Sequence, residues 1–337
     1  MPDRPTKFAG VFAQPLDTMV RWRDNLINVF ISWASHKNTA GANPAQDRAA
    51  QLEWRAGCRA IGVGYFDMPN YDWRVPATPA MIAADLADPW LYGWVGPDEA
   101  NIKPDGKTWR VSLIDYTKFW APLMAADPKD TKRRFINFSG TGLTSAWGFY
   151  DASDVVPYCQ APTDVSMDWY PKNMEPERYP NQYVGRGLRM LGRVAPPKPK
   201  WAFLECSDQQ LASSNGGRAP TLDDMEAQYQ ALLAEQQNLV GLIWFPQAPK
   251  PSAAHLFDNS DDAHRAKIKE INSRFLGGLP VTTVPAPVPL PVIVPPVVAV
   301  PSDPNKVLRD KIDALSRDVA DLKATLKSGF TGSFKLA

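Results

Sequence analysis

The sequence is poor in cysteine and histidine. Its 337 residues include three of each, and they are far apart in the chain. So few cysteines exclude a disulfide framework, and neither residue type shows the spacing of zinc ligands. The sequence therefore predicts that the protein uses no metal and no other cofactor.

An excess of charge of either sign is also missing. The 37 lysines and arginines nearly balance the 36 aspartates and glutamates, which leaves a net charge of +1. Nucleic-acid binding needs a strong positive surface, so this class of partner is excluded. The first residues, MPDRPTKFAGVF, lack the apolar segment of a signal peptide. We expect synthesis in a cytoplasm without an export signal.

A long uncharged run begins near the C-terminal end. No charged residue occurs between Leu279 and Ser302, and the run is long enough to suggest a membrane span. Eight prolines within it exclude that interpretation, because each interior proline removes a helical hydrogen bond. The segment 279–304 is predicted to be a stiff, extended Pro/Val-rich linker.

A short heptad pattern follows the linker. Apolar residues alternate at spacings of four and three, as in the a and d positions of a coiled coil: Leu308, Ile312, Leu315, Val319, Leu322 and Leu326. We expect a helix over 305–328 that joins copies of the chain into a dimer or trimer. Alternatively, this helix packs on the main domain of its own chain. Residues 329–337 are predicted to form an extended tail.

Residues 1–278 suit a single (β/α)8 barrel in length. Eight apolar runs are strand candidates, and helical patterns lie between them: 8–13, 26–33, 58–65, 90–95, 134–138, 165–169, 200–205 and 239–245. Thr78 and Thr221 each begin a helical pattern, and Gly57 is expected to end the helix that begins after Asn43. The alternation predicts a TIM barrel, with an open parallel sheet as the alternative.

Carboxylates follow two of the predicted strands. Asp98 and Glu99 come after the fourth run in LYGWVGPDEAN, and Glu205 ends the seventh in KWAFLE. In such barrels the functional residues lie at the carboxyl ends of the strands. An unpaired carboxylate at the end of an apolar run has its pKa raised by desolvation, which suits acid/base or nucleophilic chemistry.

This pair of glutamates resembles the retaining glycoside hydrolases with TIM barrels (clan A). The resemblance implies that Glu99 is the general acid/base and Glu205 the nucleophile, about 5 Å apart. Asp98 stands where that superfamily commonly has asparagine, and would accept the bond from a sugar hydroxyl instead. Further substrate contacts are expected at the strand ends: Asp67, Asp168, Trp169, Tyr170 and Trp244.

Each of these residues also has a structural interpretation. Glu99 alternatively caps the helix after the fourth strand, and Glu205 alternatively forms an ion pair within the fold. Trp169 and Trp244 are as well suited to filling the core as to stacking on a sugar.

The order of barrel, linker and short coil resembles a phage virion protein, such as a tail or head fibre. This resemblance implies a place in the virion, a bacterial surface glycan as target and contacts with other virion proteins. Two hypotheses follow: a retaining glycosidase that cleaves surface polysaccharide, or a non-catalytic fibre protein whose barrel binds glycan or decorates the particle. A third, an ordinary cytosolic glycosidase, leaves the linker and the coil without a purpose.

Overall fold

The structure is a computed structural model, and it describes nine stretches of the chain: 5–12, 18–32, 44–102, 110–140, 152–174, 180–206, 218–235, 237–245 and 262–277. All of them belong to one compact unit, Met1–Val281. The predicted linker 279–304, coiled-coil helix 305–328 and tail 329–337 lie outside the described residues.

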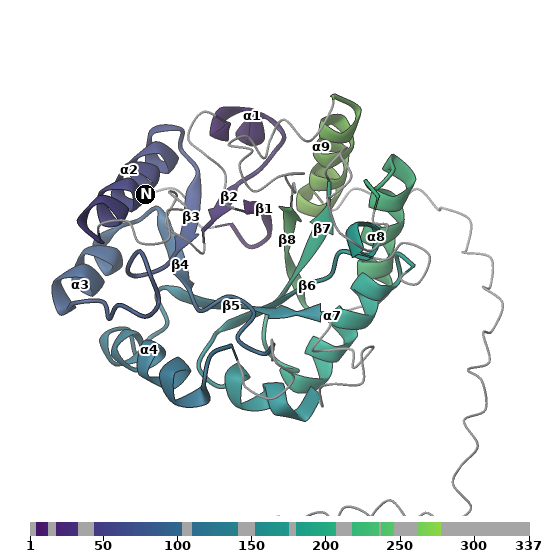
Figure 1. Cartoon of the computed structure of the whole chain (residues 1–337). Helices are drawn as coiled ribbons and strands as arrows, with labels where there is room; N and C mark the ends of the chain where they lie inside the picture. The colour runs from purple at the N-terminus through teal and green to yellow at the C-terminus, as the bar shows by residue number, and fades with distance from the viewer. Residues whose placement is uncertain are drawn as a thin grey trace, which may run out of the picture. The chain divides into compact units, whose positions relative to one another are not determined.

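Eight parallel strands close into a barrel, as Figure 1 shows from one end. The strands are β1 (Phe8–Phe12), β2 (Val29–Ile31), β3 (Gly64–Asp67), β4 (Leu91–Val95), β5 (Arg133–Ser139), β6 (Asp164–Asp168), β7 (Lys200–Glu205) and β8 (Leu239–Phe245). Each strand pairs with the next, and β8 pairs with β1 from Phe8 opposite Gly241 to Val11 opposite Trp244. This closure confirms the predicted barrel and excludes the open sheet.

Helices surround the barrel as an outer ring (Figure 1). They are α1 (Met19–Asp24), α2 (Pro44–Ala60), α3 (Pro79–Ala87), α4 (Leu113–Ala126), the 3-10 helix η1 (Ala152–Cys159), α6 (Pro171–Met174), α7 (Tyr183–Val194), α8 (Leu222–Ala234) and α9 (Asp262–Gly277). Thr78 and Thr221 cap α3 and α8 as predicted, because each side chain accepts a backbone N–H of the first turn. None of the described helices is long and apolar enough to cross a membrane.

The third strand begins later than the sequence predicts. Helix α2 does not end at Gly57 but continues to Ala60, so most of the run expected as strand 58–65 belongs to the helix and its turn. Cys58 faces the core with 0% exposure, which explains why this helix end looks like a buried strand in the sequence. Gly62, at φ +72°, turns the chain towards β3.

Aromatic side chains fill the part of the barrel interior that lies away from the carboxyl ends of the strands. The ring of Trp201 stacks on Phe8 at 4.8 Å between centroids, and meets Phe66 and Phe135 edge-on at 5.3 and 5.2 Å. On β8, a Cβ atom at Gly241 would lie 2.0 Å from the Trp201 ring, so only glycine leaves room for it. This aromatic floor supports the polar residues at the carboxyl end of the strands.

Candidate active site

The chain after β4 is tied to β5, and this fixes the position of Asp98 and Glu99. The backbone N–H of Gly96 donates to Phe135 O, and that of Glu99 donates to Asn137 O at 3.1 Å. Glu99 has φ +47°, in the left-handed region that few residues other than glycine adopt. Such backbone strain clusters at functional sites, where the surrounding structure holds it in place.

A buried asparagine on β5 links two acidic side chains. Asn137 Nδ2 donates to Asp98 Oδ1 and to Asp168 Oδ2, each at 3.0 Å. Its own Oδ1 accepts a bond from Ser166 Oγ at 2.8 Å, which orients the amide. Asn137 is 1% exposed, so the bridge lies within the barrel. The ends of β4, β5 and β6 are thereby joined through side chains.

The two bridged acids do not behave like surface carboxylates. Burial, and then the nearby charge of Glu99, raise the pKa of Asp98 to about 7. Burial and the charges of Glu99 and Asp98 also raise the pKa of Asp168 well above its usual range. The hydrogen bonds from Asn137 lower both pKa values, but burial outweighs them. A carboxyl group of this pair is therefore protonated near neutral pH.

Glu99 differs from its neighbours because it is ion-paired. Arg110 Nη1 lies 2.9 Å from Glu99 Oε2, and the Glu99 side chain is 23% exposed. The same arginine is held by its backbone N–H, which donates to Ile102 O at 2.7 Å. The chain after β4 thus carries an aspartate that can hold a proton, Asp98, next to a glutamate that is paired with an arginine, Glu99.

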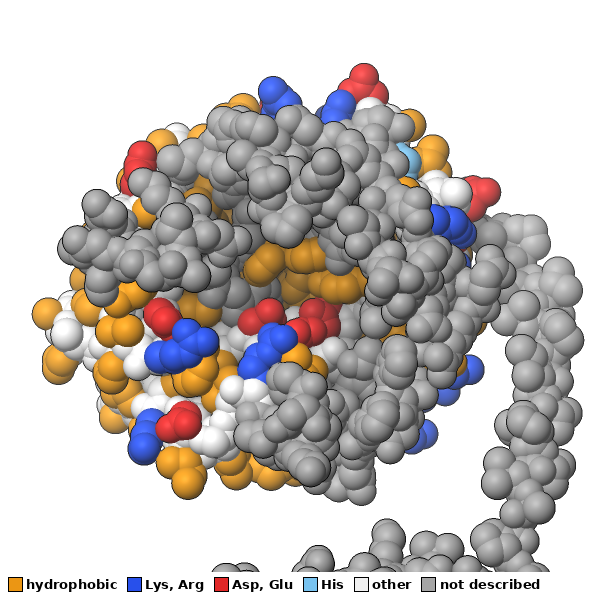
Figure 2. Space-filling view, viewed as in Figure 1, with side chains coloured by type: hydrophobic (Ala, Val, Ile, Leu, Met, Phe, Trp, Pro, Cys, Tyr) orange, Lys and Arg blue, Asp and Glu red, His pale blue; other side chains and the backbone are white. Residues whose placement is uncertain are grey.

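These groups line one pocket of about 210 Å³ at the carboxyl end of the barrel. Its described walls are acidic and amide side chains on one side and aromatic rings on the other: Asp98, Glu99, Asn137, Asp168, Tyr170, Phe12, Phe203 and Phe245. Figure 2 shows this face, with hydrophobic side chains beside acidic and basic ones at the centre. Tyr170 stacks on Phe245 at 4.8 Å between centroids. Polar groups facing an aromatic wall suit a sugar ring.

Glu205 ends β7 as predicted, but its side chain is fully buried. It is 0% exposed and is not among the residues that line the pocket. Both of its carboxylate oxygens accept from the backbone N–H of Lys172 at 3.2 Å, and Oε2 accepts from Gln228 Nε2 at 2.7 Å. These contacts tie the carboxylate to α6 and α8, and its charge also acts on Tyr170 of the pocket wall.

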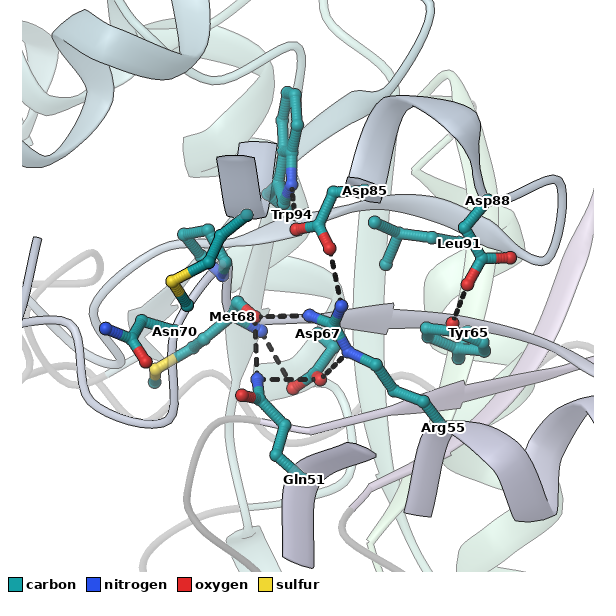
Figure 3. Close-up of polar contacts among 12 residues, drawn as sticks. Gln51, Arg55, Tyr65, Asp67, Met68, Asn70, Asp85, Asp88, Leu91 and Trp94 are labelled. Carbon is teal, nitrogen blue, oxygen red and sulfur yellow. Dashed lines mark hydrogen bonds and ion pairs between the residues drawn. The ribbon is translucent and has the colours of Figure 1, made fainter. Parts of the chain in front are cut away.

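Asp67 also lies away from the pocket, in a buried network under α2 (Figure 3). It is 2% exposed, and its Oδ2 lies 2.6 Å from Arg55 Nε and 2.9 Å from Gln51 Nε2. Arg55 also pairs with Asp85 at 2.5 Å, and Asp85 accepts from Trp94 Nε1. Asp67 therefore neutralises a buried arginine and is not a rim residue.

The two tryptophans expected as sugar platforms belong to the core layer between the barrel and the helices. Trp169 is 1% exposed and packs against Tyr183 at 5.3 Å between ring centroids. Trp244 is 0% exposed and donates from Nε1 to Asn272 on α9. Neither ring lines the pocket, so neither lies where the resemblance places it.

Several pocket residues were not anticipated from the sequence. Asn137 was missed although it interrupts the apolar run RRFINF, and the aromatic wall of Phe12, Phe203 and Phe245 was missed as well. Asp164 and Ser166 precede Asp168 at alternate positions of β6, which was a signal of a polar face inside the barrel. Within the described residues no three His, Cys, Asp or Glu side chains are placed to hold a metal ion.

Comparison with known proteins rests on structure. No protein-family model and no curated protein matches the sequence. Among solved structures, a GH5_18 protein from Bifidobacterium longum subsp. infantis is 12% identical, with a TM-score of 0.56 over 81% of this chain and 80% of that one. A GH5_18 protein from Streptomyces cattleya in complex with GlcNAc is 11% identical, with a TM-score of 0.52 over 85% and 83%.

The endo-beta-1,4-mannanase from Thermotoga petrophila has the same TM-score of 0.52 at 11% identity, over 83% of this chain and 79% of that one. These neighbours are TIM-barrel glycoside hydrolases of clan A, and at such identities the similarity is one of fold. The chain therefore shares the TIM-barrel fold of these neighbours.

Proposed function

We propose that this protein is a glycoside hydrolase that cleaves a polysaccharide of the bacterial cell surface at the pocket between β4, β5 and β6. One observation carries the proposal: Asp98, Glu99 and Asp168 meet beside an aromatic wall at the end of the barrel where such enzymes work. Carboxyl groups with different protonation states in one pocket are what glycosidic cleavage requires.

Glu99 is the residue to which the resemblance gives the acid/base role, and its place in the pocket supports a part in the reaction. The nucleophile role of Glu205 has weaker support, because its carboxylate is occupied by Lys172 N–H and Gln228. A retaining double displacement through Glu205 requires that one of its carboxylate oxygens reach the sugar while the carboxylate keeps these partners.

The test is hydrolysis by the full chain. β-1,4-Mannan oligosaccharides and Manβ1-4GlcNAc are the first substrates to use, because structural neighbours include a mannanase and a complex with Manβ1-4GlcNAc. Purified bacterial surface polysaccharides come next, and reducing-end release is measured in each case. Glu99→Gln is expected to lower kcat/KM at least 100-fold. Glu53→Gln changes an exposed glutamate of α2 and serves as the matched control. Equal activity of wild type and Glu99→Gln would exclude this pocket as the active site.

The second candidate function is glycan binding without turnover. The absence of Glu205 from the described pocket lining favours it, because a retaining enzyme needs a second carboxylate that reaches the sugar carbon. Calorimetric binding of an oligosaccharide that stays intact over days, and that binds less tightly to Glu99→Gln, would support this candidate over the enzyme.

We also propose, from the sequence alone, that the segment 305–328 joins copies of the chain in a phage virion. Sedimentation of the full chain should give a dimer or trimer. A variant with Leu315→Asp and Leu322→Asp, which charges two core positions of the heptads, should sediment as a monomer. A monomeric wild type would contradict the coiled coil and favour a helix that packs within its own chain.

A further inference from the structure

We propose that Asp98 and Asp168 act as one acid pair, held together by the side-chain amide of Asn137, and that this pair delivers the proton for glycosidic cleavage. The inference rests on the proposed function, because it assigns roles within the same pocket. Asp98 and Asp168 would be catalytic residues, and Asn137 a positioning residue.

The geometry of the amide defines the pair. A single nitrogen, Asn137 Nδ2, donates to an oxygen of each acid at 3.0 Å. The two N–H bonds of an amide diverge by about 120°, so the accepting oxygens lie about 5 Å apart. Ser166, itself 0% exposed, donates to Asn137 Oδ1 and keeps the N–H₂ group turned towards the acids. The bridge is therefore preorganised.

Burial and charge then keep the pair protonated near neutral pH. Asp98 is faced by Glu99 and Arg110, and Asp168 by Glu99, Asp98 and the hydroxyl of Tyr170. Two carboxylates so close in a buried site cannot easily both ionise, and they titrate in two steps that belong to the pair. Burial and like charge raise both pKa values above the ordinary range, with Asp98 at about 7.

Glu99 is suited to a different role in the same pocket. Its carboxylate forms an ion pair with Arg110 at 2.9 Å, whereas no ion pair to Asp98 or Asp168 occurs among the described residues. Its negative charge lies where it would stabilise the positive charge that develops on the sugar ring in the transition state. The role of general acid therefore belongs to the Asp98–Asp168 pair and not to Glu99.

The proton transfer balances without any further reagent. The glycosidic C–O bond breaks, its electron pair stays on the leaving oxygen, and the pair protonates that oxygen. A water molecule then attacks the sugar carbon. Its hydroxyl group stays on that carbon, and its other proton is transferred to the pair. Each turnover restores the pair to its starting protonation state.

The first test is a titration that needs no activity. Carboxyl ¹³C signals of labelled aspartates are followed with pH in the wild type and in Asp98→Asn. Loss of the neighbouring charge should move the Asp168 midpoint at least one pH unit lower, whereas Asp223→Asn, on the exposed side of α8, should leave it in place. An unchanged Asp168 midpoint in Asp98→Asn would overturn the pair. If Asp98→Asn fails to fold, Asn137→Ala gives a second test, because the loss of its hydrogen bonds should raise both midpoints.

The second test is the pH profile of kcat/KM. The reaction needs a proton on the pair, so activity should fall as pH rises above about 7, where the pair begins to lose its protons. Asp98→Asn should move this fall to lower pH, because the pKa of Asp168 is no longer raised by a neighbouring charge. Asn137→Ala should move it to higher pH, because a bond that stabilises both carboxylates is lost. Glu99→Gln should lower kcat and also move the fall to lower pH, because the charge of Glu99 raises both pKa values. An Asp98→Asn profile that stays in place would overturn the proposal.

The two tests separate this inference from the proposed function. A wild type that hydrolyses no glycan would overturn the enzyme and the delivery step, while the titration still decides whether the acids are paired. An active wild type whose acids titrate independently would overturn the pair and leave the proposed function standing.

Discussion

Removal of Arg55 should reveal how strongly the fold depends on buried charge. Its side chain is 4% exposed and forms ion pairs with Asp67 at 2.6 Å and Asp85 at 2.5 Å (Figure 3). It also donates to Met68 O at 2.7 Å. Arg55→Met keeps much of the apolar stem but leaves two buried carboxylates without their cation. Loss of one partner of a buried pair costs about 3–5 kcal/mol, so we expect a loss of this size at pH 7.

The same helix offers a matched control one turn further on. Arg59 pairs with Asp88 at 2.7 Å, but its side chain is 38% exposed. Exposed ion pairs contribute about 0–1 kcal/mol, so Arg59→Met should cost no more than that. The assay is urea unfolding of wild type and both variants, followed by tryptophan fluorescence and far-ultraviolet circular dichroism.

The pH dependence of the loss adds a second check. Burial raises the folded-state pKa values of Asp67 and Asp85, while Arg55 lowers them. Without the arginine both pKa values rise further, so the two aspartates of the folded variant are protonated at low pH and carry no buried charge. As pH rises they must ionise without a cation beside them, and the folded variant loses stability. The deficit of Arg55→Met should therefore widen from about pH 4 to pH 7. A deficit no larger than that of Arg59→Met at pH 7 would refute the reasoning.

Three further variants test other contacts. Glu205→Gln should lower the free energy of unfolding by about 2 kcal/mol, because its amide N–H₂ opposes the N–H groups of Lys172 and Gln228, and urea unfolding checks this. Gly241→Ala should lower the free energy of unfolding by at least about 2 kcal/mol, because the ring of Trp201 occupies the space of the added methyl group. The same urea unfolding assay checks this value. Thr221→Ala removes the cap of α8 and should cost about 1 kcal/mol in the same unfolding assay, and a neutral effect would contradict the cap.

The barrel could be predicted because its eight apolar runs alternate with helical patterns that begin at recognisable caps. At the site, Asp98, Glu99, Asp168 and Tyr170 were expected near one another, and the structure brings them to one pocket. Their position after strands of a parallel barrel was enough, because the carboxyl ends of all strands meet at one face.

The misplaced residues share one physical reason, which is the alternation of side chains along a strand. Trp169 follows Asp168 by one position and so faces the helices. Trp244 lies between Ile243 and Phe245, which face the barrel interior. Asp67 likewise follows the inward Phe66 and turns towards α2.

Glu205 could not be placed by this rule. Counting from the inward Phe203 directs it to the pocket, but its carboxylate is held by Gln228, 23 positions further along the chain, and by the backbone of Lys172. Local pattern does not reveal such partners.

The stack of Trp201 on Phe8 determines from which end of the barrel a ligand can reach the pocket. Because aromatic rings fill the barrel beneath the acids, the described interior offers no passage from one end to the other. In the proposed hydrolase, substrate and products would therefore enter and leave at the carboxyl end of the barrel, and a polysaccharide would bind across that end without passing through the barrel.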